Sequence, residues 1–263
     1  MFELTSPEVS YMVGLFQTDG THSGSTAGKG RLTLEISIRD ADLLPRLQRH
    51  LPCCSSIGSR VRDTNFKTAY VSQRLNVYDQ DVRAFFEQCG VPTGKKSAEI
   101  RPPAAIYSRP DYLRGIIDGD GSIGFTAQGY PFISLVTASP YIAQHFCAEV
   151  RAVCGVTRTA RRNKRDSAFN IMVTNTSAVA LARWCYPSGC LAMRRKRIAA
   201  RAVLEWQPPH SGFGRQQTAW TPEEDAMLAG RSIKESAQLL GRTEQSVNLR
   251  RWRLRNSGAL NGP

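Results

Sequence analysis

The 263-residue sequence predicts an α+β protein made of two similar halves and a small helical module at its C-terminal end. Three observations support this fold class. A ten-residue segment at positions 11–20 returns in a related form at 112–121, which indicates an internal repeat. After each copy, patterns typical of half-buried strands alternate with patterns typical of amphipathic helices. The composition then changes after Trp206, where Pro, Gly and Ser become frequent.

Each copy of the repeat is expected to form a helix that ends at an Asp-Gly pair. The copies read YMVGLFQTDG and YLRGIIDGDG, and they lie 101 residues apart. Pro7 and Pro110, each followed by an acid, precede them. Proline is tolerated in the first helical turn, and an acid there complements the helix dipole. The glycine after the last aspartate lets the chain leave the helix, so we expect helices that end near Asp19 and Asp120.

The segments after the two helices match each other in kind. In the first half, alternating apolar residues predict a strand around 32–38, and Asp40 is expected to cap a helix that extends to Leu51. A strand over 69–77 and a helix over 79–89 complete the unit. The corresponding elements of the second half are expected at 132–137, 139–150, 169–173 and 177–184. The two halves close on basic segments with lysines, at 94–97 and 194–197.

The chain is therefore expected to have four parts: a first half at 1–103, a second half at 104–206, a linker at 207–219 and a helical module at 220–256. In the module, a Ser or Thr is expected to cap each of three short helices. Val247, Trp252 and Leu254 have core spacing on the third helix, and arginines surround them. Three short helices with a basic last one are typical of a helix-turn-helix unit.

The charge of the chain favours a polyanionic partner. It carries 35 Lys and Arg against 22 Asp and Glu, and twelve of the cations lie between positions 151 and 201 with a single acid. Nucleic acid is the simplest partner for such a field. No apolar run has the length of a membrane span and no secretory signal is apparent, so we expect a cytoplasmic protein without a membrane partner. Seven cysteines without a C-x-x-C pair favour reduced thiols over disulfides or a zinc site.

The paired helices also suggest a chemistry. Gly14 and Gly115 lack side chains, so the two helices can approach closely if they pack face to face. Packed in parallel about a pseudo-twofold axis, they would bring Asp19 and Asp120 together at their ends. Two adjacent carboxylates repel each other unless a cation lies beside them. Oxygen ligands suit Mg²⁺, and such a site can activate a water for phosphodiester hydrolysis.

Met12–Gly20 and Leu113–Gly121 resemble the two copies of the LAGLIDADG motif, and residues 6–205 resemble a single-chain homing endonuclease of that family. The first copy departs from the family pattern at Gln17, where an acid is usual, and at Thr18, where a small residue is usual. The resemblance implies a pseudo-twofold pair of αββαββα halves whose saddle-shaped sheets lie along the major groove of double-stranded DNA. It also implies a monomer that acts as a pseudo-dimer.

The resemblance further implies a metal site and its neighbours. The implied ligands of Mg²⁺, or of another divalent cation such as Mn²⁺, are Asp19, Asp120 and the carbonyls of Thr18 and Gly119. Lys96 and Lys196 would order the attacking water or stabilise charge, and Lys95 stays open as an alternative to Lys96.

The resemblance also implies DNA contacts on the exposed faces of the two sheets. In the first half the expected residues are Arg31, Glu35, Ser37, Arg39, Arg60, Arg62, Lys67, Gln73 and Arg74. In the second half they are Arg158, Arg161, Arg162, Lys164, Arg165 and Asn170. Arg, Gln and Asn can read base edges, whereas Lys mostly meets phosphate.

The C-terminal module resembles the Myb/SANT-like helix-turn-helix domains through its WTPEED start and the pattern of its third helix. In such domains the third helix enters the major groove, and the residues expected to contact DNA are Gln245, Asn248, Arg251 and Arg255. A helical cap packed on the main body is the alternative interpretation.

Three functions fit these features. The first is a bacterial or phage-encoded homing endonuclease that makes metal-dependent double-strand cuts at a long DNA target. The second is a LAGLIDADG-fold transcriptional regulator that binds DNA without cutting, towards which Gln17 and Thr18 point. The third is an RNA-splicing maturase, which would share the fold and the charge.

Overall fold

The computed structural model describes residues 2–25, 28–64, 67–163, 166–208 and 220–257. The chain divides into two compact units, Met1–Phe213 and Gly214–Pro263, which we call the main unit and the C-terminal module. Positions 209–219 of the expected linker lie outside the described residues. None of the helices in the described ranges is long and apolar enough to cross a membrane.

The first half of the main unit has the element order αββαββα. Its elements are α1 (Pro7–Asp19), β1 (Gly20–Gly24), β2 (Gly30–Ser37), α2 (Leu43–Gln48), β3 (Ser55–Thr64), β4 (Lys67–Val77) and α3 (Gln80–Gln88). The strands form an antiparallel sheet in the order β1-β2-β4-β3. Leu32, Leu34 and Ile36 of β2 are buried in the core, because alternate residues of a strand point to one face.

The second half repeats this order and adds one helix. Its elements are α4 (Arg109–Asp120), β5 (Gly121–Phe125), β6 (Pro131–Thr137), α5 (Pro140–Cys154), β7 (Arg161–Arg162), β8 (Phe169–Thr174), α6 (Asn175–Cys185) and α7 (Arg194–Glu205). The strands form a second antiparallel sheet in the order β5-β6-β8-β7. The expected α+β fold with two αββαββα halves is therefore confirmed, and α7 is an element that the sequence patterns do not predict.

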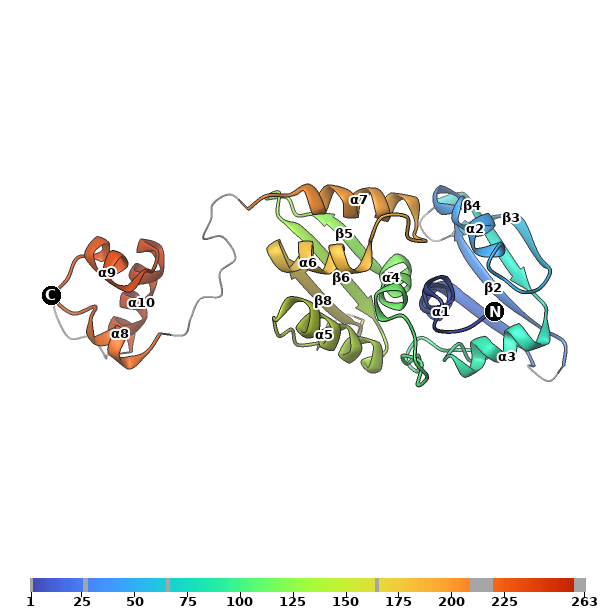
Figure 1. Ribbon diagram of the computed structural model, residues 1–263, viewed down its shortest axis with the longest axis horizontal. Helices are drawn as coiled ribbons and strands as arrows, with labels where there is room; N and C mark the ends of the chain where they lie inside the picture. Colours follow the sequence, from blue (N-terminus) through green and yellow to red (C-terminus); the bar gives the residue numbers. More distant parts are fainter. Residues whose placement is uncertain (1, 26–27, 65–66, 164–165, 209–219, 258–263) are drawn as a thin grey trace. The chain divides into compact units, whose positions relative to one another are not determined.

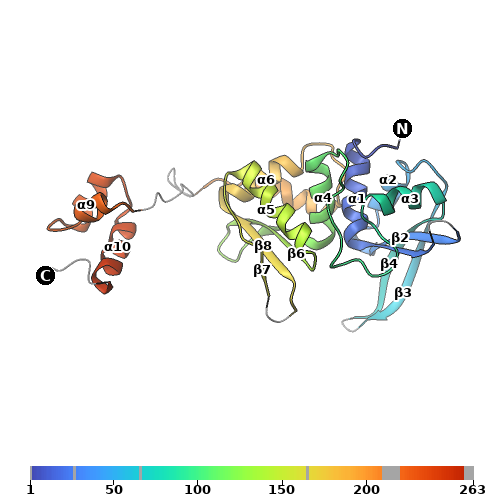
Figure 2. The same ribbon diagram turned by 90° about the horizontal axis from the view of Figure 1, so that it is seen from below.

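The two halves meet at α1 and α4, which lie side by side at the centre of the main unit (Figures 1 and 2). Both helices are almost wholly buried, and one hydrophobic core extends through both halves. The hairpins β3–β4 and β7–β8 project from the two halves on the same side of the helix pair (Figure 2). The chain enters β1 directly after Asp19 and β5 directly after Asp120, so each sheet begins where a repeat helix ends.

The expected role of Asp40 as a helix cap is wrong. Asp40 is the last residue of a short 3-10 helix, Ile38–Asp40, and α2 begins only at Leu43. The Asp40 carboxylate is buried and accepts hydrogen bonds at 3.0 and 2.8 Å from Nε of Arg195 in the other half. A capping aspartate and a buried ion-pair partner share the same residue type, so the local pattern alone does not separate them.

The C-terminal module contains α8 (Pro222–Ala226), α9 (Ile233–Leu240) and α10 (Glu244–Asn256), each with the expected Thr or Ser side chain capping its first turn. Its core contains Leu228, Ala237, Val247 and Leu254. Trp252 does not belong to this core, since it is 60% exposed. Val247 and Leu254 are two helical turns apart and share a face, whereas Trp252 projects from another side of α10.

Candidate functional site

The helices α1 and α4 are in backbone contact where the sequence places its paired glycines. A Cβ on Gly14 would lie 2.3 Å from the Tyr112 carbonyl oxygen, and a Cβ on Gly115 would lie 2.2 Å from the Tyr11 carbonyl oxygen. No side chain fits at such distances, so glycine is required at both positions. This contact brings the ends of the two helices together.

Asp19 and Asp120 are the last residues of α1 and α4 and influence each other electrostatically. Desolvation, together with the nearby Asp120 carboxylate, raises the pKa of Asp19 to about 6. Asp120 is open to water on one side, but the protein around it still desolvates the carboxylate and raises its pKa. Neither carboxylate accepts a hydrogen bond from another group in the described part of the chain.

This donor set fits a hard divalent cation. Two adjacent carboxylates with raised pKa values, which accept no hydrogen bond from the described residues, are stabilised by a cation that shares their oxygens. The described residues contain no group of three His, Cys, Asp or Glu side chains that could hold a metal alone, so further ligands would be carbonyls, water or substrate oxygen. Thr18 and Gly119 precede the two aspartates, and the Thr18 carbonyl accepts a hydrogen bond at 3.1 Å from Lys96 Nζ.

Lys96 and Lys196 occupy equivalent positions under the two helix ends. Lys96 Nζ donates to the carbonyls of Gln17 and Thr18. Lys196 Nζ donates to the carbonyls of Ile117, Asp118 and Gly121 at 2.5, 2.6 and 2.8 Å. Both lysines are buried, whereas Lys95 is exposed. Desolvation lowers the pKa of each buried lysine to about 8, although the neighbouring aspartates oppose this shift.

These contacts give the lysines a structural role in addition to the one implied by the resemblance. The last carbonyls of a helix lack partners within the helix, and an ammonium group can satisfy them and complement the helix dipole. A charged lysine has three N–H groups. Lys196 uses all three on carbonyls, whereas Lys96 uses two on carbonyls of the described residues.

Gln17 has a structural function that an acid could not perform. Its side-chain oxygen accepts a hydrogen bond at 2.6 Å from the Tyr112 hydroxyl of α4. Its amide nitrogen donates to the carbonyls of Cys89 and Arg101 at 2.7 and 2.8 Å. A carboxylate has no N–H and would face these two carbonyls without a donor. These contacts account for Gln17, one of the two positions at which the first copy departs from the LAGLIDADG pattern that it resembles.

Asp118 is the counterpart of Gln17 in the second motif. It is fully buried and accepts hydrogen bonds at 2.7 Å from the hydroxyls of Tyr11 and Tyr186 and from the backbone N–H of Met193. Each repeat helix thus sends its first tyrosine to the equivalent residue of the other helix. Sequence reasoning missed these positioning contacts, although the tyrosine that opens both copies is a visible signal.

The outward face of the first sheet, opposite the helices, carries a network around one carboxylate. Glu35 pairs with Arg74 at 2.8 Å, Arg60 at 3.3 Å and Arg62 at 3.4 Å, and it accepts a hydrogen bond from the Ser72 hydroxyl at 2.7 Å. Although partial burial opposes it, hydrogen bonds from Ser72 and Arg74 lower the pKa of Glu35. We call this surface the first outer face; its residues are Arg31, Thr33, Glu35, Ser37, Arg60, Arg62, Ser72 and Arg74.

Some predicted members of this face lie elsewhere. Gln73 is in register with Ile36 and Ser59. Consecutive residues of a strand point to opposite sides, so the side chain of Gln73 is on the opposite face from that of Arg74. The expectation that both share the exposed face is therefore wrong. Arg39 is exposed in the 3-10 turn after β2. The side chain of Lys67 lies outside the described part of the structure.

The outward face of the second sheet has a different composition. Its residues, which we call the second outer face, are Ser122, Phe132, Ser134, Val136, Arg161, Asn170, Met172 and Thr174. Arg158 donates from Nε to the Met172 carbonyl at 3.2 Å at the edge of this sheet. Arg162 is in register with Phe169 and its guanidinium lies 5.0 Å from that ring, so it belongs to the opposite face. Lys164 and Arg165 lie outside the described residues.

In the C-terminal module, Gln245, Asn248 and Arg255 are exposed on α10. Arg251 instead donates to the carbonyls of Leu228 and Arg231 and is only partly exposed, so it ties α10 to the connection between α8 and α9.

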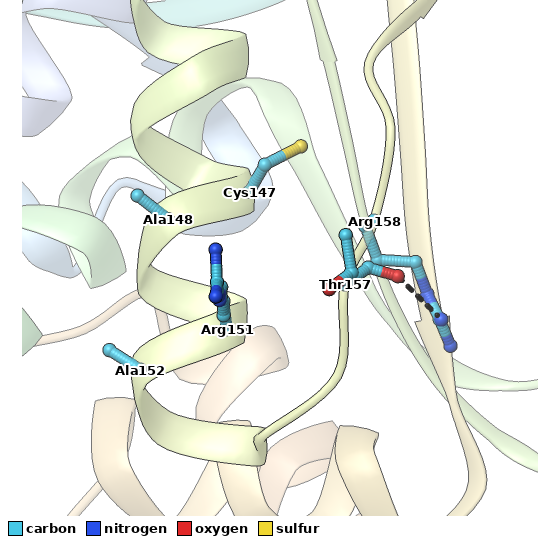
Figure 3. A pocket seen from close by; sticks show the side chains of 6 residues that line it. All are labelled: Cys147, Ala148, Arg151, Ala152, Thr157 and Arg158. Atoms are coloured by element: carbon cyan, nitrogen blue, oxygen red, sulfur yellow. Dashed lines mark hydrogen bonds between the residues drawn. The ribbon is translucent and has the colours of Figure 1, made fainter.

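A pocket beside α5 does not compete with the carboxylate pair as a reactive site. It is lined by Cys147, Ala148, Arg151, Ala152, Thr157 and Arg158 (Figure 3). Burial raises the pKa of the Cys147 thiol, so the pocket contains no ionised nucleophile at neutral pH.

No family model and no curated protein matches this sequence. Several solved structures have a similar arrangement. The homing endonuclease I-WcaI bound to its DNA recognition sequence matches at 12% identity and a TM-score of 0.49, over 74% of this chain and 87% of that chain. Mesophilic variants of the homing endonuclease I-DmoI match at 12% identity and 0.48, over 70% and 97%. The meganuclease I-SmaMI bound to uncleavable DNA matches at 11% identity and 0.46, over 69% and 82%.

Proposed function

We propose that this protein is a site-specific DNA endonuclease of the LAGLIDADG type that hydrolyses phosphodiester bonds with the help of a divalent cation. One observation carries the proposal: at the ends of two helices in backbone contact stand two carboxylates that accept no hydrogen bond from the described residues, and a sheet begins directly after each of them. The net charge of +13 supports DNA as the partner. We propose a monomer, because the chain supplies both carboxylates itself.

Asp19 and Asp120 would hold the cation, with the carbonyls of Thr18 and Gly119 as the nearest backbone candidates. When bound, Mg²⁺ or Mn²⁺ would stabilise developing negative charge on the phosphodiester and lower the pKa of a bound water. The lysines fix the geometry of the helix ends that carry the aspartates. Lys96, which donates to two carbonyls of the described residues, would orient a water or a phosphate oxygen with its third N–H group.

The aspartate assignment is tested by Asp120→Asn. The amide keeps the shape of the side chain but removes the charge that holds the cation, so we expect cleavage to fall by at least about 100-fold, as for loss of other charge-stabilising groups. DNA binding should change little. The measurement is cleavage of a DNA target recovered from a random-sequence library, in Mg²⁺ and in EDTA. Asp42→Asn, at an exposed position in the turn before α2, is the matched control.

Two results would contradict the proposal. Wild-type cleavage by Asp120→Asn would remove the carboxylate pair from the mechanism. Tight, sequence-specific binding by the wild-type protein without any cut in Mg²⁺ or Mn²⁺ would instead support the DNA-binding regulator, and protein-dependent splicing of an intron would support the maturase.

A further inference from the structure

The two outer faces offer different chemistry to a ligand. On the first outer face, Arg60, Arg62 and Arg74 surround Glu35, and Arg31 is exposed nearby in β2. Tyr70, in register with Arg62, adds one aromatic ring to this face, and among the described residues in register on it there is no aliphatic side chain. The shared carboxylate holds three guanidinium groups in place, which reduces the rotamer freedom they would lose on binding.

The second outer face carries an apolar stripe. Met172 is in register with Ser134, so Phe132 and Val136 are its two diagonal neighbours on the adjacent strand. Side chains of this size reach their diagonal neighbours, so Met172 can contact both. Met172 and Val136 are each 46% exposed, and Phe132 is half-buried. Arg161 is the single charged side chain on this face among the described residues. The outward face of an antiparallel sheet is normally polar, so this stripe needs an explanation.

Both faces belong to sheets whose first strand begins at the candidate site. Strands β1 and β5 start at the residues after Asp19 and Asp120, and β2 and β6 pair with them. A duplex held at the carboxylates would therefore meet both outer faces, one on each side of the cut.

We infer that the two sheets read different bases: the first outer face takes a half-site that presents guanines in the major groove, and the second takes a half-site rich in thymine that is recognised through the thymine methyl groups. This inference rests on the proposed DNA-endonuclease function. Arginine binds the O6 and N7 acceptors of guanine with its fork of donors, and apolar side chains contact the C5-methyl group of thymine. A sheet face with one arginine, Arg161, and three large apolar side chains suits the second kind of contact.

The experiment removes single groups from the DNA. A target is first selected from a random-sequence duplex library with the full-length protein, and the centre of the cut or footprint divides it into half-sites. Thymines of one half-site at a time are then replaced by deoxyuridine, which removes only the methyl group. We expect binding to weaken about fourfold for each methyl group removed from the thymine-reading half-site, and no change in the other. Replacing guanines by 7-deazaguanine should give the opposite pattern, with about fivefold or larger decreases in affinity.

A protein variant links the effect to the sheet. Val136→Thr combined with Met172→Gln keeps the side-chain sizes but makes the stripe polar, so the sensitivity to deoxyuridine should disappear. Val61→Thr is the matched control, since Val61 is 63% exposed and in register with Val71, on the opposite face of the first sheet from Arg60 and Arg62. Thermal unfolding of all variants checks that they fold.

Equal sensitivity of the two half-sites to deoxyuridine, or sensitivity that survives in the Val136→Thr, Met172→Gln variant, would overturn the inference while leaving the endonuclease function intact. A protein that selects no duplex from the library would overturn the proposed function and the inference together.

Discussion

The ionised form of Asp19 is unfavourable in the folded protein, because desolvation and the neighbouring Asp120 raise its pKa from 3.8 to about 6. When an acid has a higher pKa in the folded than in the unfolded state, its ionisation destabilises the fold. The free energy of unfolding then falls as the pH rises above the unfolded pKa, and it stops falling once the pH is above the folded pKa. We therefore expect Asp19→Asn to increase the free energy of unfolding of the metal-free protein by about 1–3 kcal/mol at pH 8.

Chemical denaturation in EDTA measures this difference, which should shrink at pH 4.5. Adding Mg²⁺ should stabilise the wild-type protein and reduce the advantage of the variant, because a ligand that binds only the folded state stabilises it. An Asn variant that is no more stable than the wild type at pH 8 would contradict the electrostatic coupling of the two aspartates.

Gln17 leads to a second prediction at the scale of a single side chain. Gln17→Glu restores the acid of the family pattern but places a carboxylate against the carbonyls of Cys89 and Arg101. We expect a loss of about 2–4 kcal/mol in the free energy of unfolding near pH 8, which decreases at low pH as the new acid takes up a proton. Gln80→Glu, in the exposed first turn of α3, is the matched control and should be neutral. Improved stability or cleavage in Gln17→Glu would mean that the amide contacts are unimportant.

The packing of α1 against α4 is a property of whole elements, and Gly115→Ala tests it. The added methyl group meets the backbone of Tyr11, which cannot move aside as a flexible side chain would. Separating the helices should lower the free energy of unfolding by about 3 kcal/mol, which is the upper part of the range for overpacked cores. It should also lower the cleavage rate, because it moves the two aspartates apart. Gly58→Ala on β3, where a Cβ meets nothing within 4 Å, is the control for stability. Equal stability of the two variants would contradict the backbone contact.

Elements with a clear apolar period or a repeated motif were predictable, and those formed by pairing alone were not. The strands β2 and β6 have buried apolar side chains at alternate positions. The helices α1 and α4 are buried on all sides over most of their length, and they were predicted from the repeat, with its Pro-acid starts and Asp-Gly ends. By contrast, β1 has the sequence GTHSG, without an apolar pattern, and it forms a strand because it pairs with β2. Such pairing depends on another segment of the chain and is not visible in the local sequence. The same holds for the site: the paired Asp-Gly ends and glycines were visible in the repeat, whereas the contacts of Gln17 and Asp118 depend on partners from distant segments.

At the scale of the whole molecule, the C-terminal module should extend the DNA footprint. Several of its arginines are used internally, since Arg242 pairs with Glu224 and Arg250 with Asp225, but Arg253 and Arg255 are exposed in the last turns of α10. Truncation after Gln207 should weaken DNA binding and shorten the protected region at one end while cleavage chemistry persists. The slope of log affinity against log salt should fall by about 0.9 for each phosphate that the truncated protein no longer touches.

Footprinting and a salt titration on the full-length and truncated proteins measure these effects. Thermal unfolding of the truncated protein is the control. An unchanged footprint and salt slope would show that the module does not touch DNA, and loss of folding on truncation would favour the helical cap.

Thr18 and Gly119 face each other across the helix pair, and a Cβ on Gly119 would lie 1.9 Å from the Thr18 hydroxyl oxygen. The two copies of the repeat thus differ at this point, because one helix carries a threonine side chain and the other leaves the space for it. A symmetric pair of first halves would set threonine against threonine and could not close. The interface is therefore asymmetric at this point, and only one of the two helices can carry a side chain there.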